Sequence, residues 1–221
     1  MKLWMNALCK YLLGLVLVGL LVFLPAGSLA YGGGWLFIGL LFGPMLLLGI
    51  VLLVKAPTLL EKRLNNNEKR SAQKKVTSWV AMMFVGGFIV AGLDHRYGWS
   101  TVPLWGVIAA AVVLVLAYAL YAEVMRENAY LSRTVEVQEG QQVVDSGLYG
   151  IVRHPMYAVT LWLFLAIPVV LGSLWAVACF AVYIPLIVAR IRDEETLLTA
   201  QLDGYATYKK KVKYRLIPWI W

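Results

Sequence analysis

The chain contains 221 residues, of which 61% are hydrophobic and only 14% are charged. Soluble domains average about 45–50% apolar and about 25% charged residues, so this composition excludes most soluble folds and any chain dominated by disorder. Lysine and arginine outnumber aspartate and glutamate by 20 to 12, but no soluble basic face is available, and we therefore expect no nucleic-acid partner.

The composition predicts an all-α, polytopic integral membrane protein, since a membrane-spanning helix takes about 20 apolar residues. Tyr11–Val54 carries no charge, and we expect it to form two helices, separated by a glycine-rich turn within Pro25–Gly34. We expect the first helix to be retained as a span rather than cleaved as part of a signal peptide. A polar, basic segment follows at Lys55–Lys75, and it contains an asparagine tract at Asn65–Asn67.

Later apolar segments raise the expected total to about six. The third and fourth spans are predicted at Val76–Leu93 and Val102–Ala122. Pro155–Ala189 is also uncharged, and Gly172 and Ser173 divide it into two segments of about 17 residues each, near the lower limit for crossing a bilayer. We interpret these last two segments as a short helical hairpin.

The basic residues predict the orientation, because lysine and arginine gather in the cytoplasmic segments of membrane proteins. With a cytoplasmic N-terminus, the cytoplasmic segments are Met1–Lys10, Lys55–Lys75, Glu123–His154 and Arg190–Trp221. These segments hold every lysine and arginine except Arg96. We therefore expect both termini, and the polar segments that could hold an active site, to face the cytoplasm.

The apolar segments contain no charged side chain, whereas ion-coupled transporters and channels usually place such residues within their spans. Polar residues gather instead at the predicted cytoplasmic ends of the last helices, which favours an enzyme acting at the interface on a lipid-like substrate. Cys9 and Cys179 lie far apart, and His95 and His154 lie on opposite predicted faces, so we expect neither a disulfide framework nor a metal site. The sequence contains no dinucleotide fingerprint, phosphate loop or nucleophile elbow.

The densest polar cluster surrounds His154, between Gly147 and Tyr157. Pro155 can begin a helix because the first helical position needs no N–H group, and this places His154 at or next to the N-cap. Free N–H groups at a helix start favour anionic or electron-rich groups. The alternative is that Arg153 and His154 only anchor a helix at the lipid head groups, but an arginine, a histidine and two tyrosines around one helix start favour a binding site.

A second cluster, Arg190–Glu195, begins where the last apolar segment ends. If the helix continues, Arg190 and Glu194 lie four residues apart on one face. They could form a solvated ion pair, which contributes only a few tenths of a kcal/mol. Alternatively, Glu194 could bind the ammonium group of a ligand while Arg190 holds a ligand carboxylate, and the spacing alone leaves both interpretations open.

Two blocks in the C-terminal half are recognisable as motifs. The first comprises Gln141-Gln142-Val143-Val144-Asp145-Ser146-Gly147-Leu148-Tyr149 and Val152-Arg153-His154-Pro155-Met156-Tyr157; the second comprises Arg190-Ile191-x-x-Glu194-Glu195-x-x-Leu198, Tyr205-x-x-Tyr208 and Arg215-Leu216-Ile217-Pro218. In order and separation they resemble the isoprenylcysteine carboxyl methyltransferase family over about Asn128–Pro218. The chain departs from many relatives at Leu148, where they have proline, at Val159, where they have glycine, and at Leu202–Gly204, where a Phe-Gly pair is usual.

We expect a single membrane domain. Residues 1–122 hold four spans, which match the family only in hydropathy, and the resemblance makes residues 123–221 the catalytic half. It implies transfer of a methyl group from S-adenosylmethionine to a lipid-like or prenylated acceptor, with Arg190 facing the acceptor carboxylate. The donor-binding residues that it implies are Gln141, Gln142, Val143, Val144, Tyr149, His154, Pro155, Met156, Tyr157, Glu194 and Glu195, with Gln138 as a further match in a loop of variable length. A carboxylate acceptor is already ionised at pH 7, so positioning and desolvation would provide most of the catalysis.

Two other functions remain open at this point. The first is a phospholipid or other lipid N-methyltransferase, because related membrane enzymes have a similar donor site. The second is a small transporter or a membrane scaffold without enzymatic activity. The sequence itself does not identify the methyl acceptor.

Overall fold

The computed structural model describes residues 2–65, 68 and 70–221. The described residues form helices, turns and irregular segments and contain no strand, which confirms the predicted all-α fold class. Met1, Asn66, Asn67 and Lys69, which belong to the predicted N-terminal and Lys55–Lys75 polar segments, lie outside the described residues.

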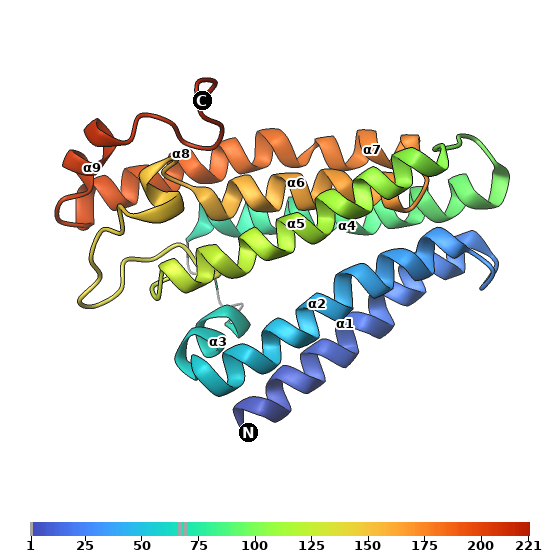
Figure 1. The fold of residues 1–221 in the computed structure, drawn as a ribbon, viewed down its shortest axis with the longest axis horizontal. Coiled ribbons are helices and arrows are strands. Elements are labelled where there is room, and N and C mark those ends of the chain that lie inside the picture. The colour runs from blue at the N-terminus through green and yellow to red at the C-terminus, as the bar shows by residue number, and fades with distance from the viewer. Residues whose placement is uncertain (1, 66–67, 69) are drawn as a thin grey trace.

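Long helices form the first half of the chain (Figure 1). They are α1 (Leu3–Ala26), α2 (Gly32–Lys55), α4 (Ser71–Tyr97) and α5 (Leu104–Glu127), with the short α3 (Pro57–Leu64) between α2 and α4. The second half contains the 3₁₀ turn η1 (Gly147–Gly150), α6 (Pro155–Val170), α7 (Leu174–Ala181), α8 (Tyr183–Gln201) and α9 (Tyr205–Lys211).

Among the described residues, five helical stretches are long and apolar enough to cross a membrane: α1, α2, α4, α5 and the stretch Leu174–Gln201, formed by α7 and α8. α6 is apolar but has only 16 residues. The chain is therefore a multi-pass integral membrane protein. The predicted hairpin is unequal, because its second arm passes Ala189 and continues to Gln201, through a sequence rich in good helix formers and without glycine or proline.

Helix α4 packs against α1, α7 and α8. Two of its glycines permit this close approach. A Cβ at Gly92 would lie 2.8 Å from the carbonyl oxygen of Val22 on α1, and a Cβ at Gly87 would clash with the buried ring of Phe180 on α7. Helix α5 packs along α6, and its side chain Leu114 is fully buried.

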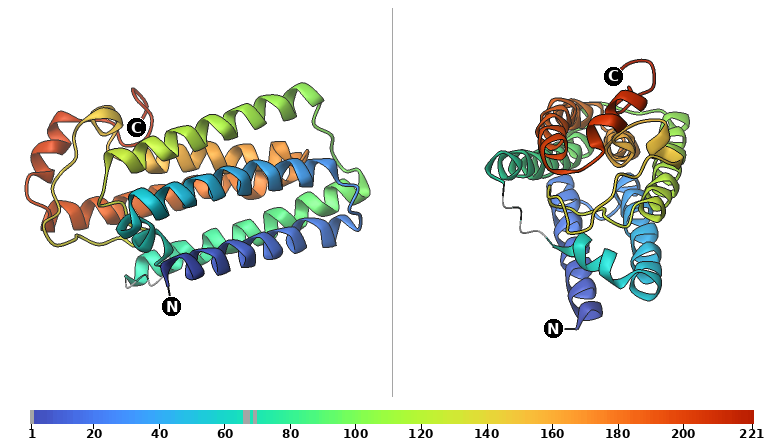
Figure 2. Two further views of the ribbon diagram at one scale, coloured as in Figure 1. Left: turned by 60° about the horizontal axis from the view of Figure 1, so that its bottom comes forward. Right: turned by 90° about the vertical axis from the view of Figure 1, so that its left-hand side faces the viewer.

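The two ends of the bundle differ in chemistry. At one end short turns join the helices, and the buried carboxylate of Asp94 accepts hydrogen bonds from the hydroxyls of Ser100, at 2.6 Å, and Ser173, at 2.5 Å. The opposite end carries α3, the irregular segment 128–146 and α9 with the C-terminal tail (Figure 2). Most of the basic segments recognised in the sequence therefore gather at one end of the molecule.

Candidate active site

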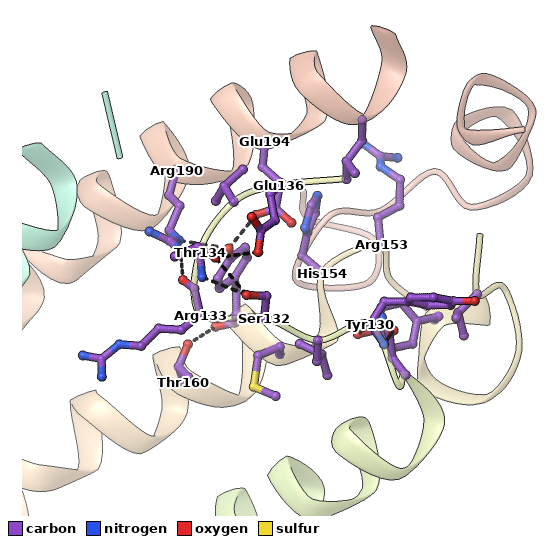
Figure 3. A pocket seen from close by; sticks show the side chains of 18 of the residues that line it. Tyr130, Ser132, Arg133, Thr134, Glu136, Arg153, His154, Thr160, Arg190 and Glu194 are labelled. Carbon is purple, nitrogen blue, oxygen red and sulfur yellow. Dashed lines mark hydrogen bonds between the residues drawn. The ribbon is translucent and has the colours of Figure 1, made fainter. Parts of the chain in front are cut away.

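A cavity of about 300 Å³ lies at this polar end, where segment 128–146, α6, α8 and α9 meet (Figure 3). Most of the site residues expected from the sequence line it. These are Gln141, Gln142, Val143, Val144, Tyr149, His154, Met156, Tyr157, Arg190 and Glu194. Gln138, Pro155 and Glu195 do not line it, and the structure places each of them in a supporting position.

The start of α6 follows the sequence-based prediction, with His154 at the N-cap and Pro155 as the first helical residue. The backbone N–H of His154 donates to the carbonyl of Arg215 at 2.9 Å, so the C-terminal tail pairs with the residues that precede the helix. The His154 ring stacks on the Tyr157 ring, with 5.7 Å between centroids. Pro155 itself is buried, and it begins the helix that presents His154 and Tyr157 to the cavity.

The Tyr157 hydroxyl lies between Arg190 and Glu194. It donates to Glu194 Oε2 at 2.5 Å and accepts from Arg190 Nε at 2.9 Å. Arg190 and Glu194 both reach the cavity from α8, as their spacing predicts, yet they form no direct ion pair in the described structure. The tyrosine therefore separates a carboxylate from a guanidinium within one cavity.

Glu195 lies outside the cavity, in a buried ionic cluster. Its Oε1 accepts from Arg153 Nε at 2.6 Å and lies 3.3 Å from His154 Nε2, and its Oε2 accepts from Arg215 Nε at 2.9 Å. Both carboxylate oxygens are therefore engaged by the protein. This geometry joins α8 to the start of α6 and to the C-terminal tail, and it leaves Glu194 as the α8 carboxylate that reaches the cavity.

Gln138 holds the irregular segment in place rather than lining the cavity. Its amide oxygen accepts from Lys62 Nζ of α3 at 2.5 Å, and its amide nitrogen donates to the Tyr130 carbonyl at 2.6 Å. A second tie comes from Glu68, whose Oε2 accepts from the backbone N–H of Val135 at 3.1 Å. These contacts fix a cavity wall that has no regular secondary structure.

Several cavity residues were not expected from the sequence. They include Tyr130, Ser132, Arg133, Thr134, Glu136, Thr160, Tyr205 and Tyr208. The match at Tyr205-x-x-Tyr208 was the available signal for the two C-terminal tyrosines, whereas the irregular segment carried no helical spacing from which its facing residues could be deduced.

The hydroxyls of Tyr205 and Tyr208 differ in their hydrogen bonding. Tyr208 donates to the carbonyl of Tyr149 at 2.7 Å. The Tyr205 hydroxyl is buried and has no hydrogen-bond partner among the described residues. Burial raises the pKa of Tyr205 above its ordinary value, so the hydroxyl stays protonated at neutral pH and can donate to a ligand.

Comparison with known proteins gives a match to this part of the chain. Residues 107–200 match the model of the isoprenylcysteine carboxyl methyltransferase (ICMT) family. This match agrees with the resemblance to that family carried by the two sequence motifs. The matched segment runs from α5 to the end of α8 and contains both Arg190 and Glu194, while Tyr205 and Tyr208 follow it. The match supports a membrane methyltransferase.

The chain is also similar to the Delta(14)-sterol reductase TM7SF2 of Mus musculus. The two are 34% identical over 91 residues, which make up 40% of this chain and 22% of that protein. The chain thus spans only about a fifth of the length of this curated relative. Because the similarity is partial, the relative's named activity is not extended to this chain.

Proposed function

We propose that the protein is an S-adenosylmethionine-dependent methyltransferase whose acceptor is lipid-like, with the carboxylate of an isoprenylcysteine-type molecule as the acceptor that the family match favours. The observation that carries this proposal is the Tyr157 hydroxyl between Glu194 and Arg190. It provides two adjacent positions in one cavity, one suited to a cationic donor and one suited to an anionic nucleophile.

The cavity residues fit the donor. Glu194 can accept a charge-assisted hydrogen bond from the donor's ammonium group, and the free hydroxyl of Tyr205 can donate to one of its acceptor atoms. The N-terminus of α6, beside His154, favours an electron-rich group. S-adenosylmethionine supplies a methyl group on a positively charged sulfur when it is bound.

On the acceptor side, the residues of this chain position an ion and exclude water. Arg190 is held by two hydrogen bonds, from Nε to Tyr157 at 2.9 Å and from Nη2 to the Arg133 carbonyl at 2.8 Å, which leaves Nη1 available to a carboxylate. The carboxylate is ionised at neutral pH and needs no general base. Apolar lining residues, including Phe164 and Ile187, provide the desolvation that would raise its reactivity.

We further propose that the cavity faces the cytoplasm. Lysine and arginine are concentrated in the segments at the cavity end, and only Arg96 lies in a predicted external segment. Reporter tags inserted in the α3–α4 connection and in the turn at residues 98–103 test this. The first tag should be cytoplasmic and the second external; the opposite result would show that the orientation is wrong.

The decisive test of the activity uses the purified full chain in detergent. Calorimetry should detect binding of S-adenosylhomocysteine, and Glu194→Gln should weaken it, whereas Glu139→Gln, at an exposed position of the irregular segment, should not. Labelled methyl groups should appear on a farnesylcysteine analogue rather than on phosphatidylethanolamine. Transfer to the amine alone would favour a lipid N-methyltransferase, and an absence of binding at millimolar ligand would favour a transporter or scaffold.

A further inference from the structure

One wall of the cavity carries a guanidinium that the protein does not pair. Arg133 belongs to the irregular segment, and its side chain has no hydrogen-bond or ion-pair partner among the described residues, although its carbonyl accepts from Arg190. Figure 3 shows this side chain directed away from Glu194, on the side of the cavity where Thr160 of α6 lies. Arg133 is exposed in the protein alone, so a ligand can reach it.

Three other arginines line the same cavity, and the protein fixes each of them. Arg153 pairs with Glu195 at 2.6 Å. Arg63 of α3 donates to the hydroxyl of Tyr121 and, at 3.4 Å, to the carbonyl of Ser132. Arg190 is fixed as described above. Partial desolvation and the nearby charges of Arg63 and Arg190 lower the pKa of the Arg133 guanidinium. Three like charges therefore surround one part of the cavity, and an anion placed there would be favoured.

The carboxylates that line the cavity or tie down its irregular wall are already engaged. Glu136 accepts from the Thr134 hydroxyl at 3.0 Å, Glu68 accepts from backbone N–H groups, and Glu194 accepts from Tyr157. None of them forms an ion pair with Arg133 in the part of the chain that the structure describes. The Arg133 guanidinium is therefore free to pair with an anionic ligand.

Beyond the arginines the cavity wall is apolar and comes from membrane-spanning helices. Val76 and Val80 lie on α4, Phe164 on α6 and Ile187 on α8. A ligand that fills both parts must carry a negative group at one end and an apolar chain at the other. This is the chemistry of an anionic amphiphile.

We infer that Arg133 and Arg190 together form an oxyanion-binding site, and that Arg133 makes the enzyme selective for acceptors that carry an oxyanion on an apolar chain. The inference rests on the proposed function, since it identifies the bound anion as the methyl acceptor. Arg190 orients the oxyanion next to the donor, and Arg133 is a specificity-determining residue that adds a second charged contact. A protonated amine head group would place a cation beside two guanidinium groups, which disfavours binding of an ammonium group at this site.

Binding measurements on the full chain, saturated with S-adenosylhomocysteine, test the inference. The probes are N-acetyl-S-farnesylcysteine, its neutral methyl ester and a short-chain phosphatidic acid. Arg133→Gln should weaken binding of the free acid about ten- to a hundredfold and leave binding of the ester unchanged. Arg133→Lys, which keeps the charge, should retain part of the affinity. Arg126→Gln is the matched control, because Arg126 pairs with Glu123 at 2.6 Å, outside the cavity.

Three results would overturn the inference. The first is an equal loss for acid and ester, which would make Arg133 a general contact for amphiphiles. The second is unchanged affinity for the acid. The third is an Arg133-dependent preference for phosphatidic acid over the farnesylated acid, which would assign the site to the phosphate of a bilayer lipid rather than to the acceptor. Binding of S-adenosylhomocysteine, measured separately, reports on the proposed function and on correct folding of each variant.

Discussion

Replacing Glu194 with glutamine keeps the shape of the side chain and removes the negative charge that the cavity offers to a cationic donor. Among the described residues this carboxylate has one donor, the Tyr157 hydroxyl at 2.5 Å, so it retains acceptor capacity for a ligand. A charge-assisted hydrogen bond contributes about 1.5–3 kcal/mol, which corresponds to about ten- to a hundredfold in affinity. We expect Glu194→Gln to weaken S-adenosylhomocysteine binding by this factor.

Arg190→Lys should have the complementary effect. Lysine cannot reproduce the planar guanidinium that contacts Tyr157 and the Arg133 carbonyl at once, so the orientation of the acceptor should be lost while donor binding stays nearly unchanged. Calorimetry of donor binding and the rate of methyl transfer, measured for both variants, check the two effects. If both variants lose donor affinity and turnover in parallel, or if neither changes, the division of roles across Tyr157 is wrong.

The remaining predictions concern stability and pH. Glu195→Gln should strongly lower the melting temperature of the protein in detergent, because it leaves Arg153 with an uncompensated buried charge, which costs about 3–5 kcal/mol. Asp145→Asn breaks only an exposed ion pair and should leave the melting temperature nearly unchanged. Gly147→Ala should also destabilise the protein, because Gly147 has φ +54° and an added Cβ would clash with Glu127. A smaller side chain at position 127 should relieve the clash but not the backbone strain. Equal melting curves for Gly147→Ala and the unsubstituted protein would contradict this prediction. The rate of methyl transfer to a carboxylate should vary little between about pH 6 and 9. The rate of transfer to an amine would instead rise about tenfold per pH unit up to the amine's pKa near 10, so a steep rise would count against O-methylation.

Hydropathy and the position of Pro155 were sufficient to predict the long apolar helices and the N-cap at His154, but not the short helices α3 and α9. Hydropathy failed at the end of the last apolar segment, because the helix continues through charged residues to Gln201. A change from apolar to polar sequence marks the membrane boundary, but it does not end a helix. Arg190 and Glu194 share the cavity because the helix continues past that boundary.

The adjacent carboxylates of Glu194 and Glu195 show why the site could be predicted only in part. Consecutive helical residues differ by about 100° in direction, so the two side chains cannot serve the same cavity equally. Which of them faces the ligand depends on Arg153 and Arg215, and the latter lies 20 residues further along the chain. Arg133 escaped prediction for a related reason, because contacts made by Lys62 and Glu68 fix the irregular segment that carries it.

Leu148 illustrates how a departure from the family pattern acquires a structural role. Its backbone N–H donates to both carboxylate oxygens of Glu127, at 2.9 and 3.1 Å. Proline, which many relatives have at this position, has no N–H group and could not form these bonds. The contact joins the end of α5 to η1, the turn that carries Tyr149 to the cavity wall. Glu127, which does not line the cavity, therefore fixes the turn that carries Tyr149.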